Sequence, residues 1–517
     1  MESKVRYGVG EQSFVVMRER ECLYVDKTRF IEKIVSSGGQ YYFLGRPRRF
    51  GKSLFLSMLK CFFQGRRELF KGLYADSMNW DWHSHPVLYL DLNIEKYQRT
   101  DNLREVIESL FRDWEKEYGA VSASESIAVR FREIIKSAHE KTGERVVVLV
   151  DEYDKPLVNN LHNREMFEFY RNELASLYSN FKSSAEHLRL VFLTGVSRFS
   201  HLTIFSGLNN IRDITYSDAF NSICGITEKE LLTDFRDGIR ELSLKFNISC
   251  EEVCHELKSR YDGYRFSAHG EDIYNPFSLV NVMEEGDFRN YWIQSGQATL
   301  IKEQLRNFNV DLASLFNTVC DLDELRGLDL ENPRPVALLY QTGYLTIKGY
   351  EDDLYTLGLP NREVTQGFLS YLLPFYAGLN NSNPRFVVHS FVKDLERGDV
   401  EGFMNRLSSM FSSVSYEMNM EKEQNLHNAL LILMKLLGLE VETEYRTSQG
   451  RIDLFIRTKK YYYIIELKLD RSAQEALDQI NEKGYALPFT AGRREVIKTG
   501  VNFSTSSRTI TEWDVGK

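Results

Sequence analysis

Two apolar stretches near the end of the chain carry acidic side chains where strands usually hold Val or Ile: Gly450-Arg451-Ile452-Asp453 and Ile464-Ile465-Glu466-Leu467-Lys468. A tight turn at 459–460 joins them into a predicted hairpin, and a two-residue turn would pair Thr458 with Tyr461. Counting outward from that pair places Asp453 directly opposite Glu466, with their Cβ atoms about 5 Å apart. The hairpin is therefore predicted to bring two carboxylates together.

Two carboxylates this close repel each other unless a divalent cation lies between them. Lys468 projects from the same face of its strand as Glu466, because it is two residues further on. We therefore predict one metal-centred site formed by Asp453, Glu466 and Lys468. The alternative is a surface hairpin with solvated charges, against which the apolar neighbours argue: Leu454, Phe455, Tyr462 and Ile464.

This layout resembles the active site of the PD-(D/E)XK nuclease superfamily, with Asp453 as its Asp and Glu466-Leu467-Lys468 as its (D/E)-X-K. The resemblance implies that Asp453 and Glu466 bind Mg²⁺ and that the site orients a water for phosphodiester cleavage. It also implies a further metal-ligating or orienting Glu on the helix before the hairpin. Glu423 fills that place, at the start of a predicted helix over 423–438.

Two polar residues beside this predicted site have open interpretations. His427 lies one helical turn after Glu423, where it either joins the site or caps the core. Gln479 lies in a predicted helix that Ser472 caps, with Glu475 at the capping-box position. The same resemblance implies that Gln479 faces the metal, and a solvated position is the alternative.

A second motif lies near the start of the chain, where the apolar run 41–44 is followed by Gly45-Arg46-Pro47-Arg48-Arg49-Phe50-Gly51-Lys52-Ser53 and then a helical run over 54–63. This is the order of a P-loop, whose backbone N–H groups cradle phosphates, whose Lys reaches the β and γ phosphates and whose Ser binds Mg²⁺. Gly45 and Gly51 enclose five residues instead of four, and Arg46 occupies the first-glycine position. We expect Arg46, Arg48 and Arg49 to add positive charge to the phosphate site.

Acidic and polar residues that end two further strands support this nucleotide site. The apolar run 145–150 is typical of a central parallel strand, and it ends in Asp151-Glu152. In P-loop ATPases an Asp at that place holds Mg²⁺ through water, and the Glu polarises the attacking water. The strand 188–193 ends in Thr194-Gly195-Val196-Ser197-Arg198, which resembles the sensor strand of AAA-type ATPases. That resemblance implies a γ-phosphate or water contact for Thr194 or Ser197 and charge stabilisation by Arg198, with a structural role as the alternative for each.

Three motifs together resemble a bacterial family of AAA-ATPase-like proteins: Tyr24-Val25-Asp26-Lys27-Thr28, the loop over 46–53, and Asp151-Glu152-Tyr153-Asp154-Lys155-Pro156. Members of this family usually carry a C-terminal PD-(D/E)XK domain, so the resemblance covers nearly the whole chain. Most members are uncharacterised. The resemblance therefore implies architecture and chemistry more than a biological role.

Composition is consistent with a folded cytoplasmic protein. The chain has 517 residues and is 43% hydrophobic, which predicts about three domains with packed cores. No secretory signal and no long apolar span occurs, so we expect no membrane association. Six cysteines show no zinc or disulfide spacing and are expected to be reduced. A net charge of −9 argues against a surface that coats DNA but leaves room for a local basic groove.

The predicted fold class is α/β. We expect a P-loop AAA-like ATPase domain with a parallel sheet over 1–220, a helical and winged-helix-like segment over 221–365, a linker over 366–399 and a restriction-endonuclease-like domain over 400–517. The strands predicted for the first domain are 41–44, 87–91, 145–150 and 188–193. The helix over 336–343 and the hairpin after it resemble a winged helix, and the acidic turn at 351–353 favours packing on the ATPase domain over DNA binding.

These features predict an ATP-binding regulator fused to an Mg²⁺-dependent nuclease acting on nucleic acid, with DNA as the favoured substrate. Family analogy alone adds a role in defence against mobile elements, and a homo-oligomer is a further expectation. Two alternatives remain: a nucleotide-dependent scaffold with an inactive nuclease fold, and an ATPase that acts on protein partners.

Overall fold

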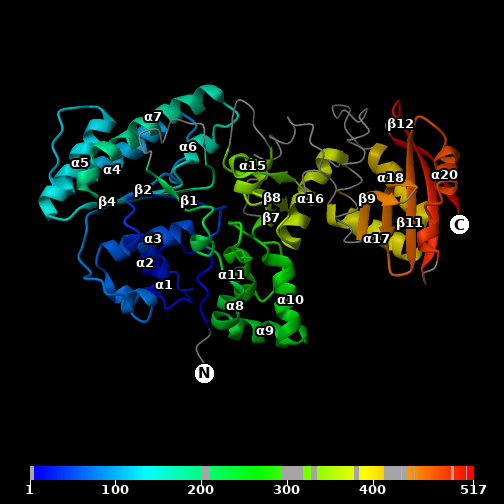
Figure 1. Ribbon diagram of the computed structural model, residues 1–517, viewed down its shortest axis with the longest axis horizontal. Helices are drawn as coiled ribbons and strands as arrows, with labels where there is room; N and C mark the ends of the chain where they lie inside the picture. Colours follow the sequence, from blue (N-terminus) through cyan, green and yellow to red (C-terminus); the bar gives the residue numbers. More distant parts are fainter. Residues whose placement is uncertain are drawn as a thin grey trace. The chain divides into compact units, whose positions relative to one another are not determined.

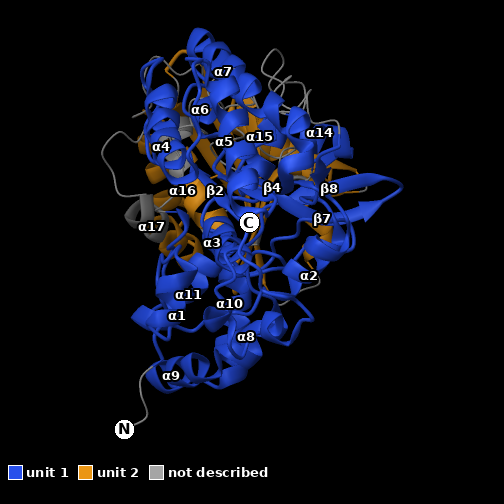
Figure 2. Ribbon diagram, turned by 90° about the vertical axis from the view of Figure 1, so that its left-hand side faces the viewer, with its two compact units in different colours: residues 1–296, 318–363 blue, residues 297–317, 364–517 orange. Residues whose placement is uncertain are grey.

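The computed structural model of the protein describes residues 5–198, 210–293, 318–327, 335–377, 384–412, 432, 440–447, 449–490, 494–507 and 509–516. The chain divides into two compact units (Figure 2). Unit 1 comprises residues 1–296 and 318–363, and unit 2 comprises residues 297–317 and 364–517. The expected boundary at 220/221 lies inside unit 1.

Unit 1 is built around a parallel sheet of five strands in the order β2-β3-β4-β1-β5. Its strands are β1 (Tyr41–Gly45), β2 (Val87–Asp91), β3 (Val146–Asp151), β4 (Leu188–Gly195) and β5 (Arg212–Asp213). Every residue of β1 and β3 is buried, as unbroken apolar runs in a parallel sheet require. The four strands predicted from the sequence are confirmed, and the order places β4 between the P-loop strand and the strand that ends at Asp151.

Helices cover both faces of this sheet (Figure 1). On one face lie α1 (Phe14–Glu19), α2 (Arg29–Ser36) and α3 (Lys52–Phe63); on the other lie α4 (Asn102–Tyr118), α5 (Ile127–Thr142), α6 (Lys155–Val158) and α7 (Arg164–Ser183). Because the strands are parallel, their carboxyl ends share one edge, where ligands of open α/β sheets bind. The P-loop, Asp151 and Thr194 all lie at that edge.

Four helices continue unit 1 after the sheet: α8 (Glu228–Asp234), α9 (Arg236–Phe246), α10 (Cys250–Tyr261) and α11 (Pro276–Glu285). Capping boxes begin two of them, Thr227 with Glu230 for α8 and Ser249 with Glu252 for α10. The helical structure expected after residue 220 is confirmed for these four helices. Apolar side chains from all four helices, including Leu231, Leu242, Leu257 and Leu279, share one buried core.

The last part of unit 1 in the sequence forms a small antiparallel sheet with the strand order β6-β8-β7. Its elements are β6 (Val319–Cys320), α14 (Leu322–Arg326), α15 (Pro335–Gln341), β7 (Thr346–Glu351) and β8 (Leu354–Gly358). The predicted order of helix and then hairpin is confirmed. Asp352 and Asp353 form the two-residue turn with φ values of 49° and 61°, as a type I′ turn requires.

Unit 2 contains a five-stranded mixed sheet in the order β13-β12-β11-β10-β9. Its elements are α16 (Arg362–Ala377, of which 364–377 lie in unit 2), α17 (Pro384–Arg397), α18 (Val400–Ser412), β9 (Glu440–Thr447), β10 (Gly450–Arg457), β11 (Tyr461–Leu469), α20 (Ala473–Glu482), β12 (Glu495–Ser504) and β13 (Thr509–Gly516). The segment expected to be a linker, 366–399, holds most of α16 and all of α17. Strands β11 and β12 run parallel, and α20 connects them as a crossover helix.

The close approach of α20 to the sheet depends on a glycine. Gly500 lies beside Glu466 in the β11–β12 register. A Cβ atom at this position would lie 2.1 Å from the carbonyl oxygen of Ala473 and 2.5 Å from the amide nitrogen of Leu477. Ser472 accepts a hydrogen bond from the Glu475 amide at 3.1 Å and begins α20, which confirms the predicted N-cap.

Two expectations concern the whole chain: the pairing of its cysteines and the presence of a membrane-spanning segment. All six cysteines lie among the described residues, and all are unpaired. Over the described ranges, no helix combines the length and the apolar character needed to cross a bilayer.

Candidate functional site

The P-loop has the backbone shape of an anion site. It leads from β1 into α3, whose first residue is Lys52. Gly51 has a φ of 96° and Arg49 a φ of 66°, so two left-handed residues alternate in the loop. Left-handed residues separated in this way favour an anion-binding nest, in which successive N–H groups turn toward one point. A left-handed residue with a side chain costs about 1 kcal/mol, so contacts around Arg49 must hold it there.

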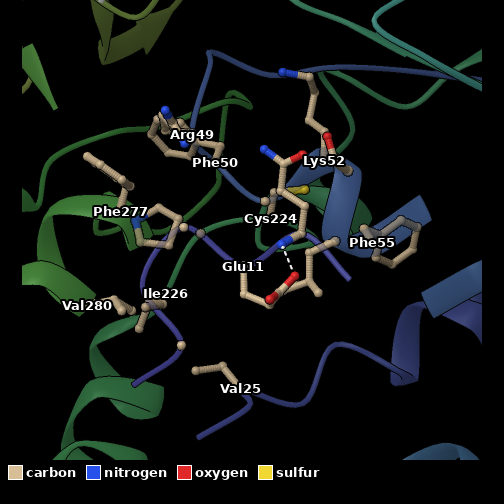
Figure 3. A pocket seen from close by; sticks show the side chains of 18 of the residues that line it. Glu11, Val25, Arg49, Phe50, Lys52, Phe55, Cys224, Ile226, Phe277 and Val280 are labelled. Carbon is tan, nitrogen blue, oxygen red and sulfur yellow. Dashed lines mark hydrogen bonds between the residues drawn. The ribbon is translucent and has the colours of Figure 1, made fainter. Parts of the chain in front are cut away.

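A pocket of about 370 Å³ opens beside this loop. Its walls come from the N-terminal segment, the P-loop, the loop 223–226 and the start of α11. Figure 3 shows Arg49, Phe50 and Phe277 on one side and Lys52 and Phe55 on the other, with Cys224 between them. The pocket therefore joins a cationic loop to an apolar wall that includes Val25, Ile226, Phe277 and Val280.

Lys52 is held inside the loop. Its Nζ donates to the carbonyl oxygens of Arg46 at 3.0 Å and Pro47 at 3.3 Å, and it lies 3.4 Å from Oε1 of Glu152. The side chains of Lys52 and Glu152 are 3% and 12% exposed, so water screens this ion pair weakly. Burial raises the pKa of Glu152, but the charges of Lys52, Arg48 and Lys155 outweigh it, and the net direction is downward.

Asp151 lies at the end of β3, where its carboxylate bonds to Thr194 and Ser53. Its Oδ1 accepts a hydrogen bond of 2.7 Å from Oγ1 of Thr194, and Ser53 also bonds to its carboxylate. Burial raises the pKa of Asp151, while these two hydrogen bonds and the charge of Lys52 lower it. The structure thus brings Lys52, Ser53, Asp151, Glu152 and Thr194 together at one edge of the sheet.

Three other predicted nucleotide residues have different surroundings. The guanidinium of Arg46 is buried and donates to the carbonyls of Gly45 and Thr215, both at 2.8 Å, and to that of Phe220 at 3.0 Å. Arg198 forms an ion pair with Asp213 on β5. The amide of Gly45 donates to Oγ1 of Thr215 at 2.8 Å. Unlike Arg48 and Arg49, which line the pocket, these residues are engaged away from it, and the guanidinium of Arg46 donates to backbone carbonyls.

Asp154 is a buried carboxylate whose position the sequence argument did not use. It accepts hydrogen bonds from the amides of Val196 at 3.1 Å and Ser197 at 2.6 Å, and so fixes the end of β4. Burial, followed by the charge of Glu152, raises its pKa to about 7. A Cβ atom on Gly195 would lie 2.6 Å from Oδ1 of Asp154, so the strand end has no room for a side chain. The signal was present in the quoted motif 151–156, three residues after Asp151.

The hairpin of unit 2 has the predicted register. Leu454 lies opposite Ile465 and Phe455 opposite Ile464, while the amide of Thr458 donates to the carbonyl of Tyr461 at 2.9 Å. The same register, continued by one residue, places Asp453 opposite Glu466. Oδ2 of Asp453 accepts a hydrogen bond of 2.8 Å from the amide of Leu467, which turns the carboxylate toward β11.

Glu466, Lys468 and Gln479 form one hydrogen-bonded cluster. Nζ of Lys468 donates to Oε1 of Gln479 at 2.5 Å and lies 3.8 Å from Oε1 of Glu466, which also accepts from the Gln479 amide. Glu466 is 2% exposed, and its Oε2 has no hydrogen-bond partner among the residues that the structure describes. Burial, and then the charge of Asp453, raises the pKa of Glu466 to about 8, against the lowering effect of Lys468.

The donor set of this cluster suits a divalent cation. A buried carboxylate oxygen that lacks a partner is costly, and a cation would satisfy it and offset the repulsion from Asp453. The described ranges hold no cluster of three or more His, Cys, Asp and Glu side chains that could bind a metal. Two carboxylates are therefore the acidic ligands available there. Glu423 and His427, the other predicted members, lie outside the described residues.

The comparisons with known proteins agree with these two sites. The model of a family described as predicted AAA-ATPase matches residues 7–205, and that of the PD-(D/E)XK nuclease superfamily matches residues 421–513. A relative described as an uncharacterized protein in the vnfD 5′ region of Azotobacter chroococcum mcd 1 is 33% identical over 521 residues, which is 98% of both chains.

A solved structure of the Aeropyrum pernix ORC2 protein, from its ADPNP–ADP complexes, is 12% identical and covers 67% of this chain and 92% of its own, with a TM-score of 0.26. That similarity is too low to carry a conclusion. The full-length relative and the two family matches are sufficient: the chain belongs to the family of predicted AAA-ATPases that carry a C-terminal domain of the PD-(D/E)XK nuclease superfamily.

Proposed function

We propose that this protein is an ATP-binding regulator fused to an Mg²⁺-dependent nuclease, and that the nucleotide state of unit 1 sets the cleavage rate of unit 2. The observation that carries the nuclease half is the buried Oε2 of Glu466, which lacks a partner among the described residues and lies beside Asp453 and Lys468. A purely structural cluster would leave this oxygen unsatisfied. A cation site explains it.

In unit 2, Asp453 and Glu466 would hold the cation. When bound, a divalent cation lowers the pKa of a water and offsets charge on a phosphate. Lys468 places an ammonium group beside the same carboxylates, where it would orient a water or stabilise the negative charge of the pentacoordinate transition state at phosphorus. Gln479 positions Lys468 and Glu466 together, because its amide bonds to both. Glu423 is proposed as a further ligand or orienting group.

In unit 1, Lys52 would bind the β and γ phosphates of ATP, and Ser53 and Asp151 would hold the accompanying Mg²⁺. To reach phosphate, Lys52 must leave the carbonyls of Arg46 and Pro47 and loosen its pairing with Glu152. That exchange would release the Glu152 carboxylate to polarise water. Thr194 holds Asp151 in place through its 2.7 Å hydrogen bond. Arg48 and Arg49 are proposed as phosphate contacts, and Arg198 as a residue that acts only if it leaves Asp213.

The proposed setting is the bacterial cytoplasm, with DNA as the substrate and mobile elements as its source. It rests on resemblance to the family. A regulated nuclease suits this setting, because unrestrained cleavage would damage the host genome.

One experiment tests the proposal. Purified protein is incubated with plasmid, linear and single-stranded DNA and with RNA, in Mg²⁺ or Mn²⁺, with ATP, ADP or no nucleotide, alongside the variants Asp151→Ala and Glu152→Gln. We expect metal-dependent cleavage whose rate changes with nucleotide and in both variants, although neither residue lies in unit 2. Identical cleavage under all nucleotide conditions would show that nucleotide does not regulate the nuclease and that the two units act independently. No cleavage of any substrate, with ATP binding intact, would favour a scaffold with an inactive nuclease fold.

A further inference from the structure

The unusual P-loop sequence is anchored from outside the parallel sheet. The guanidinium of Arg46 lies 4.2 Å from the ring centre of Phe266, and the ring of Phe50 packs edge-on against Tyr264 at 4.8 Å. Pro47 packs closely against Gly343, in the turn after α15. A Cβ atom added at Gly343 would lie 2.8 Å from the Cβ atom of Pro47. The loop therefore packs against residues from the later part of unit 1, which hold it in place.

Two of the loop residues that line the pocket, Arg48 and Arg49, have a more specific anchor. The carbonyl oxygen of Arg48 accepts a hydrogen bond of 3.0 Å from the indole Nε1 of Trp292. The guanidinium of Arg49 stacks on the ring of Phe277 with its carbon 4.8 Å from the ring centre. These contacts hold the left-handed conformation of Arg49, because they fix the residue itself and the peptide before it.

Trp292 and Ser278, the residue after Phe277, both bond to one buried carboxylate. Glu363 accepts a hydrogen bond of 2.6 Å from the backbone amide of Trp292 and another of 2.6 Å from Oγ of Ser278, the neighbour of Phe277 in α11. Glu363 is 1% exposed. A ring of contacts thus runs from the P-loop through Trp292 to Glu363, and back through Ser278 and Phe277 to the P-loop.

Glu363 also has a special place in the chain. It is the second residue of α16 (Arg362–Ala377), and the division between the two units falls directly after it, between 363 and 364. Among the described residues, α16 is the element that continues from unit 1 into unit 2. A shift of the Glu363 carboxylate therefore acts on the first turn of the helix that leads into the nuclease unit.

From this arrangement we propose that Trp292 and Glu363 are positioning residues which set the P-loop and transmit its state to α16. The inference rests on the proposed binding of ATP at this loop and names the residues through which that binding is communicated. Phosphate in the nest draws Lys52 away from the carbonyls of Arg46 and Pro47, which lie directly before the peptide that Trp292 holds. The ring of contacts then favours a different position of Glu363, and this difference couples the two sites.

Three variants separate the parts of this ring. Trp292→Phe keeps the aromatic packing but removes the N–H that binds Arg48. Glu363→Ala removes both acceptors at the start of α16, and Glu363→Gln keeps an oxygen that can accept from Trp292. Trp80→Phe is the matched control, because the buried Nε1 of Trp80 has no hydrogen-bond partner in the described part of the chain.

The measurement is hydrogen exchange of full-length protein with and without a non-hydrolysable ATP analogue, together with calorimetry of the same analogue. In wild type and Trp80→Phe we expect nucleotide to change exchange both in the loop 45–53 and in α16. Trp292→Phe and Glu363→Ala should still bind, with affinity about two- to tenfold lower, because the hydrogen bonds that they lose hold the loop and do not touch the nucleotide. In both variants the response of α16 should be lost, and Glu363→Gln should restore at least half of it.

The outcomes distinguish this inference from the function on which it rests. An unchanged α16 response in Trp292→Phe and Glu363→Ala overturns the proposed transmission, as does a wild-type protein that binds nucleotide without any response in α16. In both cases ATP binding stands. A wild-type protein that binds no nucleotide overturns the proposed function and the transmission together.

Discussion

The two candidate sites differ in how their charges are satisfied. In the nucleotide site of unit 1, Lys52 pairs with Glu152 and two carbonyls, and Asp151 pairs with Ser53 and Thr194. In the nuclease site of unit 2, one oxygen of the buried Glu466 has no hydrogen-bond partner among the described residues. The charged groups of the first site bond to one another and to the backbone, whereas the second site holds a buried oxygen without such a partner among the described residues.

This difference predicts different responses to ligand. If the proposed function holds, ATP would displace existing bonds in unit 1, and its binding would rearrange the site. A cation in unit 2 would add bonds to groups already in place, and its binding would stabilise them. Rearrangement is useful for a regulatory site and preorganisation for a catalytic one.

The strongest test removes charge from the second site. Glu466→Gln and Lys468→Ala should each lower metal-dependent cleavage by about 10²- to 10³-fold, since each removes a group placed at the proposed reaction centre. Cleavage of the preferred substrate at saturating Mg²⁺ measures the effect. Lys459→Ala, in the exposed turn of the same hairpin, is the control and should cleave at the wild-type rate. Variants that keep more than a tenth of that rate would show that the cluster is not catalytic.

The corresponding test of the first site removes Lys52. Lys52→Ala should weaken ATP binding by about 100-fold, because a buried charge-assisted contact with phosphate is lost. Calorimetry measures the affinity, and circular dichroism should show an unchanged fold. Lys60→Ala, two turns further along α3, is the control on the same helix. Equal affinity in wild type and Lys52→Ala would rule out the P-loop as the binding site.

A finer comparison is between two buried glutamates, Glu363 in unit 1 and Glu466 in unit 2, since burial raises the pKa of both. Glu363 has partners on both oxygens, yet burial raises its pKa to about 7 from an ordinary 4.5. Between those values the folded protein keeps a proton that the unfolded chain has released, so stability falls as pH rises through this window. The nearby titratable groups are Tyr261 and Tyr264, whose raised pKa values keep them neutral throughout.

We therefore expect wild type to lose about 1–3 kcal/mol of stability relative to Glu363→Gln between pH 5 and pH 7.5. Urea unfolding followed by tryptophan fluorescence reports mainly on unit 1, which holds Trp80, Trp82, Trp114 and Trp292. Parallel pH profiles for the two proteins would contradict a raised pKa at Glu363.

The smallest expected effect is thermal. Without nucleotide, Mg²⁺ at ten times its Kd should raise the unfolding temperature of unit 2 by about 3–6 °C. Glu466→Gln should abolish this increase, and Lys52→Ala should leave it unchanged. A persistent increase in Glu466→Gln would place the cation elsewhere and remove the contrast between the two sites.

The hairpin was the part of the molecule most accessible to prediction from sequence. A two-residue turn fixes the register, and the register then determines which side chains lie opposite each other. Strand patterns likewise gave the four long strands of the parallel sheet, because unbroken apolar runs mark buried parallel strands. Both inferences use local rules that need no knowledge of distant parts of the chain.

The features that could not be predicted depend on distant contacts. Arg46 was expected to add positive charge to the phosphate site, and its guanidinium donates to carbonyls 169 to 174 residues away. The contacts of Trp292 and Glu363 were not foreseen, since the hydrogen bond from Trp292 to the P-loop spans 244 residues. No periodicity in a single sequence records such pairs. The available signal was an acidic residue, Glu363, at the start of a helix whose later part is mainly apolar.

Gly500 has a consequence for judging which relatives of this protein are active enzymes. The missing side chain lets α20 approach the sheet, and α20 carries the Gln479 that links Lys468 to Glu466. A single added carbon at position 500 would move that helix and separate the linked groups, while every residue of the recognisable motif stayed in place. An apparently intact motif in a relative is thus insufficient evidence of catalysis, and genome surveys should inspect the residue aligned with Gly500 before they count a homologue as a nuclease.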